Sequence, residues 1–156
     1  MRLVPEAFKV PEKLEHPEFV IRNLCASDVY LDYIAVMSSI DIIRKTRGGD
    51  WPTTDLSFED DMIDLAWHQR EFEYRTSFAY TVMSPDGSKC LGCLYLFQPG
   101  WRNDTSKNAD VDVSFWVTQE DWLFRSLSSA CVHAAFPSTP CESALSSRGS
   151  ESTKRQ

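Results

Sequence analysis

Hydrophobic residues follow a strand-like pattern between residues 78 and 98. The apolar run at 78–83 leads into Ser84-Pro85-Asp86-Gly87, where proline sets φ for a turn and glycine tolerates a positive φ. The chain then returns through a second apolar run at 89–98. This pattern predicts an antiparallel hairpin.

A third strand is predicted after the polar loop at 101–108. Its residues alternate between an apolar face and a mixed face. The apolar face holds Val111, Val113, Phe115 and Val117, and the mixed face holds Asp110, Asp112, Ser114 and Trp116. Because Asp110 and Asp112 are two residues apart, we expect both carboxylates on the mixed face.

The segment before the hairpin predicts a strand and two helices. The β-branched and aromatic run at 19–24 indicates the strand, and Ser27 or Asp28 offers N-cap chemistry for a helix that ends at Gly48-Gly49. The expected buried stripe of that helix is Tyr30, Ile34, Met37, Ile40 and Ile43. A second helix is expected from about Phe58 to Tyr74, with Ser57 and Asp60 resembling a capping box.

The chain is expected to hold one domain, at residues 19–136. Residues 1–18 are rich in proline and charge and predict an irregular leader without an element of its own. A third helix is predicted at 120–136, and Pro137 ends it. The Ser-rich tail at 137–156 lacks the apolar residues to offset its ordering entropy, so we expect disorder there.

Composition narrows the classes of function. The net charge is −7 and the basic residues are scattered, which disfavours nucleic-acid binding. We see neither a signal-peptide pattern nor about 18 consecutive apolar residues, so we expect no membrane contact and a cytoplasmic location. The five cysteines form no framework of repeated spacings, which is typical of reduced thiols.

The C-x-x-C sequence at Cys90 and Cys93 has two interpretations. It has the form of half a zinc site or of a redox pair. It also lies inside a predicted strand, where the two side chains would point to opposite faces, and no second pair is present. We therefore favour two small strand residues on either side of Gly92, and we assign no metal ligands.

The order of these elements resembles the N-terminal part of the GNAT (Gcn5-related N-acetyltransferase) superfamily. The sequences FVIRNL with Ser27-Asp28, LGCLYL at 91–96 and DVDVSFWV at 110–117 are similar to that superfamily's first, third and fourth strands. The resemblance implies an α+β fold, a mixed but mainly antiparallel sheet with flanking helices. It also implies that the C-terminal half of the fold is incomplete, because the chain becomes Ser-rich after Phe136.

The resemblance also implies acetyl-CoA as co-substrate. Backbone groups of Phe115, Trp116 and Val117 would contact the pantetheine arm, and Gln119 would begin the pyrophosphate loop. The glycines of that loop are absent, and Glu120 and Asp121 put negative charge where phosphates would lie. We therefore expect weak or absent acetyl-CoA binding.

The candidate catalytic residues are Asp110, Asp112 and Tyr95. Either aspartate would serve as the base toward an amine acceptor, and Tyr95 would donate to the departing thiolate. A solvated strand face and a packed tyrosine are the alternative interpretations. His68 with Glu71 and the Trp51-Pro52 loop are further candidates that also have ordinary structural explanations.

Two functions follow from these expectations. The first is an N-acetyltransferase-like protein that acts on an amine of a small molecule or protein, with activity impaired by the absent loop and C-terminal half. The second is a non-catalytic interaction domain whose exposed sheet edge recruits a partner or a second copy of the chain as a homo-oligomer.

Overall fold

An antiparallel sheet of five strands forms the centre of the fold. The computed structural model describes residues 2–100 and 110–118, and the third helix and tail predicted from the sequence lie outside them. The strands follow the order β1-β2-β3-β4-β5 across the sheet, and every neighbouring pair is antiparallel. Their bounds are β1 Lys13–His16, β2 Phe19–Asn23, β3 Phe78–Met83, β4 Cys90–Phe97 and β5 Asp112–Val117. The three strands predicted between residues 78 and 117 are confirmed.

The leader contains a strand that the sequence did not predict. β1 lies inside the segment 1–18 and pairs with β2, so the expectation of an irregular leader is wrong for Lys13–His16. The pairing of Leu14 with Ile21 explains it, because a four-residue strand needs few apolar residues when a neighbour supplies the backbone partners. The rest of the proposed division, 19–136 and 137–156, stays a prediction.

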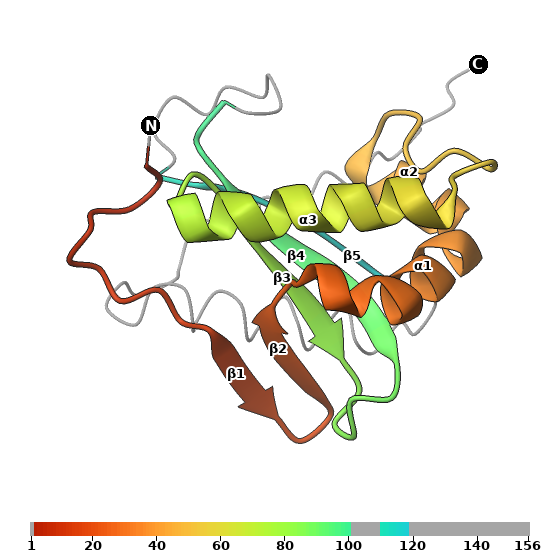
Figure 1. Cartoon of the computed structure of the whole chain (residues 1–156), viewed down its shortest axis with the longest axis horizontal. Helices are drawn as coiled ribbons and strands as arrows, with labels where there is room; N and C mark the ends of the chain where they lie inside the picture. The colour runs from red at the N-terminus through yellow and green to blue at the C-terminus, as the bar shows by residue number, and fades with distance from the viewer. Residues whose placement is uncertain (1, 101–109, 119–156) are drawn as a thin grey trace, which may run out of the picture. The chain divides into compact units, whose positions relative to one another are not determined.

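The helices lie on one face of the sheet (Figure 1). They are the 3-10 helix η1 Ala26–Asp28, then α1 Val29–Ser38, α2 Ile40–Arg47 and α3 Phe58–Tyr74. α3 has the expected bounds, and its N-cap Ser57 accepts a hydrogen bond from the backbone of Asp60 at 3.1 Å, as predicted. None of the helices in the described ranges has the length and apolar character needed to cross a membrane.

The first predicted helix is two helices, and its predicted stripe is wrong for Tyr30 and Ile34. The helix breaks at Ser39, whose φ of −126° and ψ of 17° are not helical. Tyr30 and Ile34 are 68% and 52% exposed, while Ile43 is fully buried. The buried positions of α1 include Asp32. Apolar periodicity missed this face because a carboxylate occupies one of its central positions.

The predicted capping by Asp28 is present, but on η1 rather than on α1. Asp28 precedes α1 but makes no side-chain cap for that helix. Its carboxylate accepts from the backbone N–H of Cys25 at 3.0 Å and from both terminal nitrogens of Arg22 at 2.6 and 2.8 Å. An adjacent arginine offers two charged donors, so Asp28 ties the end of β2 to η1.

The β3–β4 hairpin has the predicted turn. Gly87 has a φ of +71°, and its N–H donates to the Ser84 carbonyl at 2.8 Å. A β-bulge follows, because Val82 pairs with Gly92 whereas Met83 pairs with Cys90. One extra residue, Leu91, therefore lies in β4.

The faces of β5 are reversed relative to the apolar pattern. Trp116 and Ser114, on the mixed face, are 1% and 8% exposed, whereas Val113 on the apolar face is 52% exposed. Trp116 joins the core cluster of Ile43 and Leu65 beneath the helices. The apolar area that Trp116 buries is large enough to offset the cost of burying the small polar residues on the same strand face. The mixed face of β5 therefore points toward the helices.

Candidate functional site

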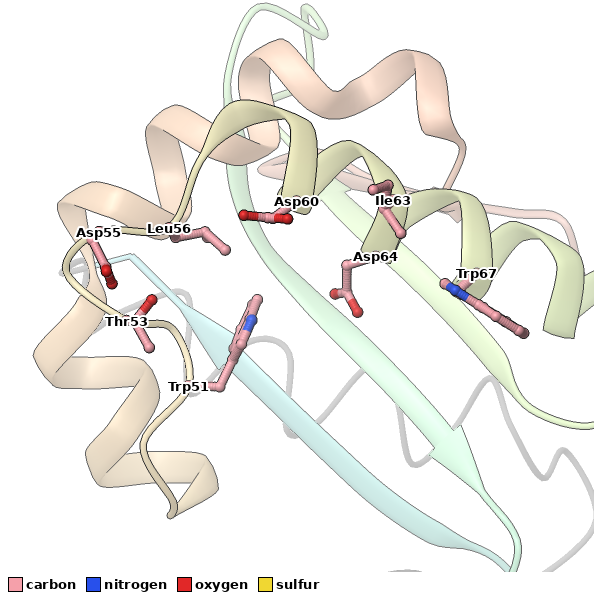
Figure 2. A pocket seen from close by; sticks show the side chains of 8 residues that line it. All are labelled: Trp51, Thr53, Asp55, Leu56, Asp60, Ile63, Asp64 and Trp67. Atoms are coloured by element: carbon pink, nitrogen blue, oxygen red, sulfur yellow. The ribbon is translucent and has the colours of Figure 1, made fainter.

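A surface hollow of about 380 Å³ lies between α3 and the loop that follows α2 (Figure 2). We call it the acidic hollow, and its lining includes Trp51, Asp55, Leu56, Asp60, Asp64 and Trp67. Figure 2 shows Asp64 pointing from α3 toward the side of the hollow that carries Trp51. Trp67 is 57% exposed, so an indole face is available to a ligand.

A second hollow of about 330 Å³ adjoins the first and shares Trp51, Asp64 and Trp67 with it. We call it the His68 hollow. It is also lined by Arg47, His68, Glu71 and Phe97.

The loop that forms both hollows is held at two points. Arg44 of α2 donates from Nε to the carbonyl of Pro52 at 2.9 Å, and Tyr33 of α1 donates to the carbonyl of Leu56 at 3.0 Å. Pro52 itself is buried. These bonds connect the loop to two helices, so the hollows are formed before any ligand arrives.

His68 lies between two carboxylates. Its Nε2 is 3.7 Å from Oδ2 of Asp64, and its Nδ1 is 3.6 Å from Oε2 of Glu71. Sequence spacing explains this arrangement. Asp64 is four residues before His68 and Glu71 is three residues after it, so all three side chains lie on the same face of α3. Glu71 is oriented by Ser77, whose hydroxyl donates to Oε2 at 2.7 Å. The His68 side chain is only 14% exposed. The imidazole therefore lies between two carboxylate groups.

Tyr95 lies beneath His68 in the sheet. It is 3% exposed, and its hydroxyl accepts from Nε1 of Trp116 at 3.3 Å. The Arg47 guanidinium lies 4.3 Å from the centre of its ring. Burial raises the pKa of Tyr95 well above its ordinary value, so the phenol keeps its proton. The role of Tyr95 as an acid stays a prediction.

The structure separates the two aspartates predicted as bases. Asp112 opens β5 and pairs with Phe97, which lines the His68 hollow. Directly opposite residues of an antiparallel pair point to the same face, so Asp112 is on the side of that hollow. It is half-buried, whereas Asp110 precedes the strand and is exposed. Neither aspartate is among the lining residues of the hollow, but Asp112 shares a sheet face with Phe97, which is.

The predicted pantetheine contacts lie on β5, one of the two edge strands of the described sheet. Trp116 and Val117 are buried, and Phe115 is half-buried. In an antiparallel pair only alternate residues bond to the neighbouring strand, so half of the β5 backbone groups face away from β4. Gln119 lies outside the described residues. The coenzyme contacts therefore stay a prediction.

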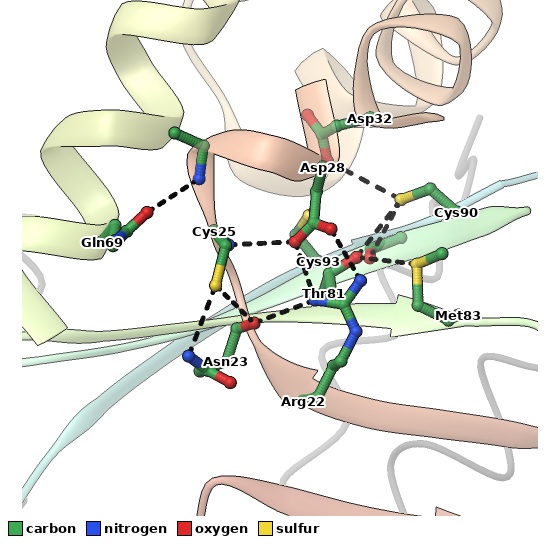
Figure 3. A network of polar contacts seen from close by, with 12 residues as sticks. Arg22, Asn23, Cys25, Asp28, Asp32, Gln69, Thr81, Met83, Cys90 and Cys93 are labelled. Atoms are coloured by element: carbon green, nitrogen blue, oxygen red, sulfur yellow. Dashed lines mark hydrogen bonds and ion pairs between the residues drawn. The ribbon is translucent and has the colours of Figure 1, made fainter. Parts of the chain in front are cut away.

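The expectation that Cys90 and Cys93 point to opposite faces is wrong. Both thiols lie near Oδ1 of Asp32, at 3.7 Å and 3.2 Å (Figure 3). The bulge at Leu91 explains the difference, because the extra residue turns Cys90 to the same face as Cys93. The burial of Asp32 and Asp61 was also missed from the sequence. A lone aspartate in a helix is usually exposed, so nothing in the pattern indicates that these two are buried.

Comparisons with known proteins agree on the fold. No protein-family model and no curated protein matches the sequence, but solved structures do. A GnaT-family acetyltransferase of Bordetella pertussis matches with a TM-score of 0.59 at 14% identity, over 83% of this chain and 74% of that one.

Two ligand complexes match as well. The ribosomal alpha-N-protein acetyltransferase RimL in complex with coenzyme A has a TM-score of 0.61 at 15% identity, over 81% of this chain and 70% of that one. The microcin self-immunity acetyltransferase MccE in complex with acetyl-CoA and AMP has a TM-score of 0.63 at 10% identity, over 83% and 69%. With its antiparallel sheet and the helices on one face, this chain has the fold of the GNAT-family acetyltransferases.

Proposed function

We propose that the chain is an N-acetyltransferase-like protein that takes an acetyl group from acetyl-CoA and passes it to an amine held in the two hollows. The position of His68 between Asp64 and Glu71, at the floor of the His68 hollow, carries this proposal. The fold supports it, since two structures of the same fold were solved with coenzyme A or acetyl-CoA.

The charges of the hollows favour a cationic acceptor. Carboxylates of Asp55, Asp60, Asp64 and Glu71 line them, against the single described cation Arg47. Negative charge gathered in a concave site raises the local concentration of a cation. Trp67, which is 57% exposed, adds a ring that already interacts with a cation, since the Arg70 guanidinium lies 5.5 Å from its centre. The amine therefore binds as an ammonium ion and must lose a proton before it reacts.

His68 and Asp112 are the groups that accept this proton. The neutral amine then attacks the thioester carbonyl carbon, the C–N bond forms and the C–S bond breaks. The nitrogen loses a second proton as it becomes an amide, and coenzyme A, which leaves as a thiolate, takes up one proton to give the thiol. His68 is the better-placed base, because Asp64 and Glu71 stabilise the imidazolium that forms. Asp112, beside Phe97, relays or accepts the proton at the strand side of the hollow.

Coenzyme affinity is a separate part of the proposal. The residues expected to replace the pyrophosphate loop, Gln119 to Asp121, lie outside the described part of the chain. Their charge still supports a weak affinity for acetyl-CoA. We therefore expect transfer to require high concentrations of acetyl-CoA.

Release of the coenzyme A thiol tests the proposed function. The full chain is incubated with millimolar acetyl-CoA and a panel of primary amines, and the free thiol is measured with a chromogenic disulfide. Thiol release that depends on the amine, with acetylated product detected by mass spectrometry, supports the proposal. Release that does not change when the amine is omitted contradicts it.

A second candidate function rests on the edge of the sheet. β5 is one of the two edge strands of the described sheet, and Val113 on it is 52% exposed. An exposed strand with an apolar residue can recruit another strand. Light scattering over a range of concentrations tests this candidate, and a mass that stays monomeric would rule out self-association through β5.

A further inference from the structure

Three side-chain atoms that could bind a metal ion lie close together in the core, on the helix side of the sheet. They are Oδ1 of Asp32 on α1 and the Sγ atoms of Cys90 and Cys93 on β4, and all lie within 4.8 Å of one another. All three residues are buried. Figure 3 shows them converging from α1 and β4. The cluster is separate from both hollows, whose linings contain none of the three residues.

Two features of the fold create this cluster. The bulge at Leu91 turns the two thiols to one face, three residues apart in sequence. α1 packs on β4 with Asp32 pointing inward. Asp32 is only 2% exposed, and the other buried residues of α1 are apolar. Neither feature is needed for an ordinary apolar core.

The distances match those around a tetrahedral metal ion. With metal–sulfur and metal–oxygen bonds of about 2.3 and 2.0 Å, a tetrahedral centre separates a sulfur from an oxygen ligand by about 3.5 Å. The observed separations are 3.2 Å for Cys93 and 3.7 Å for Cys90, both measured to Oδ1 of Asp32. Both sulfur–oxygen separations are within a few tenths of an ångström of that value, and the two sulfurs lie within 4.8 Å of each other.

The buried carboxylate has no positive partner among the described residues. Among the described residues, its hydrogen-bond donors are the two thiols, which are weak donors, and the nearby Arg22 is bound to Asp28. A buried charge without a partner is costly. Accordingly, burial raises the pKa of Asp32 to about 6 and the pKa of the Cys93 thiol well above its ordinary value. A cation would stabilise the charged forms of all three groups.

A second buried acid lies near this cluster. Asp61 on α3 is fully buried, and neither of its carboxylate oxygens has a hydrogen-bond partner among the described residues. Burial, followed by the charges of Asp32 and Asp64, raises the pKa of Asp61 to about 7. The core between α1, α3 and β4 thus holds two buried carboxyl groups, Asp32 and Asp61, that form no ion pair with a basic side chain among the described residues.

We propose that Asp32, Cys90 and Cys93 form a binding site for one zinc ion. Two thiolates and a carboxylate suit Zn²⁺, whereas Mg²⁺ and Ca²⁺ prefer oxygen ligands alone. The fourth position falls to a water or to the hydroxyl of Thr81, whose Oγ1 lies 3.6 Å from Sγ of Cys90. Binding releases the two thiol protons to solvent and leaves the zinc bonded to two sulfurs and one carboxylate oxygen. The ion would link α1 to β4.

Metal content of the full chain tests this site. The protein is purified from zinc-supplemented culture, and its zinc content is measured by inductively coupled plasma mass spectrometry. We expect about one equivalent, retained through dialysis, because a closed structural site binds tightly. Cys93→Ser and Asp32→Asn should each lose most of it. Cys25→Ser is the matched control, since Cys25 is half-buried and outside the cluster.

Cobalt provides a second readout that does not depend on the stability of a variant. Wild-type protein refolded with Co²⁺ should show thiolate-to-cobalt charge-transfer absorption and the intense visible bands of a tetrahedral site. Circular dichroism confirms that each variant is folded. Zinc well below one equivalent together with no cobalt spectrum in the wild type would overturn the proposal, and so would equal zinc in wild type and a folded Cys93→Ser protein. Neither readout involves acetyl transfer, so the result is independent of the proposed function.

Discussion

His68 on α3 packs against Tyr95 on β4, with ring centroids 5.1 Å apart and ring planes tilted by 49°. One side of the imidazole therefore faces the core of the sheet, and its nitrogens face two carboxylates at the edge of the hollow. The contact fixes the position of His68 relative to β4, and through β4 relative to Asp112 on β5. A base held by packing against a strand has a defined direction toward its substrate.

Asp112 and Asp110 make a matched pair of variants. Asp112→Asn should lower kcat/KM for amine acetylation by about 10-fold or more, because this carboxylate is on the face of the His68 hollow. Asp110→Asn should change it less than about 2-fold, since Asp110 is exposed and precedes β5. Initial rates of thiol release measure both. If kcat/KM fell equally in the two variants, the position of Asp112 on the face of the hollow would not explain its effect.

Gly92 permits the close pairing of β4 with β5. An added Cβ would lie 2.1 Å from the carbonyl oxygen of Trp116, and the φ of Gly92 is +151°. Gly92→Ala should therefore destabilise the protein by more than about 3 kcal/mol. Gly87→Ala is the control: its φ is +71° but space around it is open, so the cost should be about 1 kcal/mol. Urea unfolding of both variants measures the difference, and similar midpoints would show that β4 and β5 are not closely paired there.

Asp61 should make stability depend on pH. Its pKa is raised from 3.8 to about 7 in the folded protein, so between these values the folded state binds more protons than the unfolded state. The free energy of unfolding should therefore fall as the pH rises from about 4 to 7, by on the order of 2 kcal/mol. Asp32 contributes in the same direction, up to about pH 6.

Two variants separate the contribution of Asp61 from that of other groups. Asp61→Asn should flatten the pH dependence, whereas Glu59→Gln, an exposed acid in the same turn, should leave it unchanged. Thermal melts in metal-free buffer across this range provide the measurement. An unfolding free energy that rises with pH in the wild type, or an equal slope in Asp61→Asn, would contradict the assignment.

The Arg22–Asp28 pair should matter more than a surface pair. Asp28 is 9% exposed and accepts two bonds from Arg22. Asp28→Ala should cost about 2 kcal/mol, because it leaves the Arg22 charge and the Cys25 N–H without their acceptor. Glu6→Ala removes an exposed pair with Arg2 and should cost less than about 0.5 kcal/mol. Chemical denaturation compares them, and equal costs would show that burial does not strengthen the first pair.

Strand and helix patterns predicted most of the described fold. The hairpin at 78–97, the strand that follows it and the bounds of α3 depend on local signals such as Gly87 and the cap Ser57, and these were confirmed. The break at Ser39 was not predictable in this way, since nothing in the local sequence of an apolar helix demands it. β1 was missed because its stability comes from pairing with β2.

The candidate site was only partly predictable. The spacing of Asp64, His68 and Glu71 along one helix face was visible in the sequence, but the contact of His68 with Tyr95 depends on how α3 packs on the sheet. The convergence of the two thiols depends on the bulge at Leu91, a single inserted residue that reverses the side-chain alternation of a strand. Sequence periodicity does not reveal such an insertion.

The role of His68 in amine acetylation is the central claim, and replacement of this residue tests it most directly. Wild-type protein and His68→Gln are compared at millimolar acetyl-CoA with the best amine of the panel, with Glu59→Gln as a control on the same helix. We predict that kcat/KM falls at least about 100-fold in His68→Gln while Glu59→Gln keeps the wild-type value. Wild-type protein without amine-dependent transfer, or a folded His68→Gln protein with unchanged kcat/KM, would contradict the account.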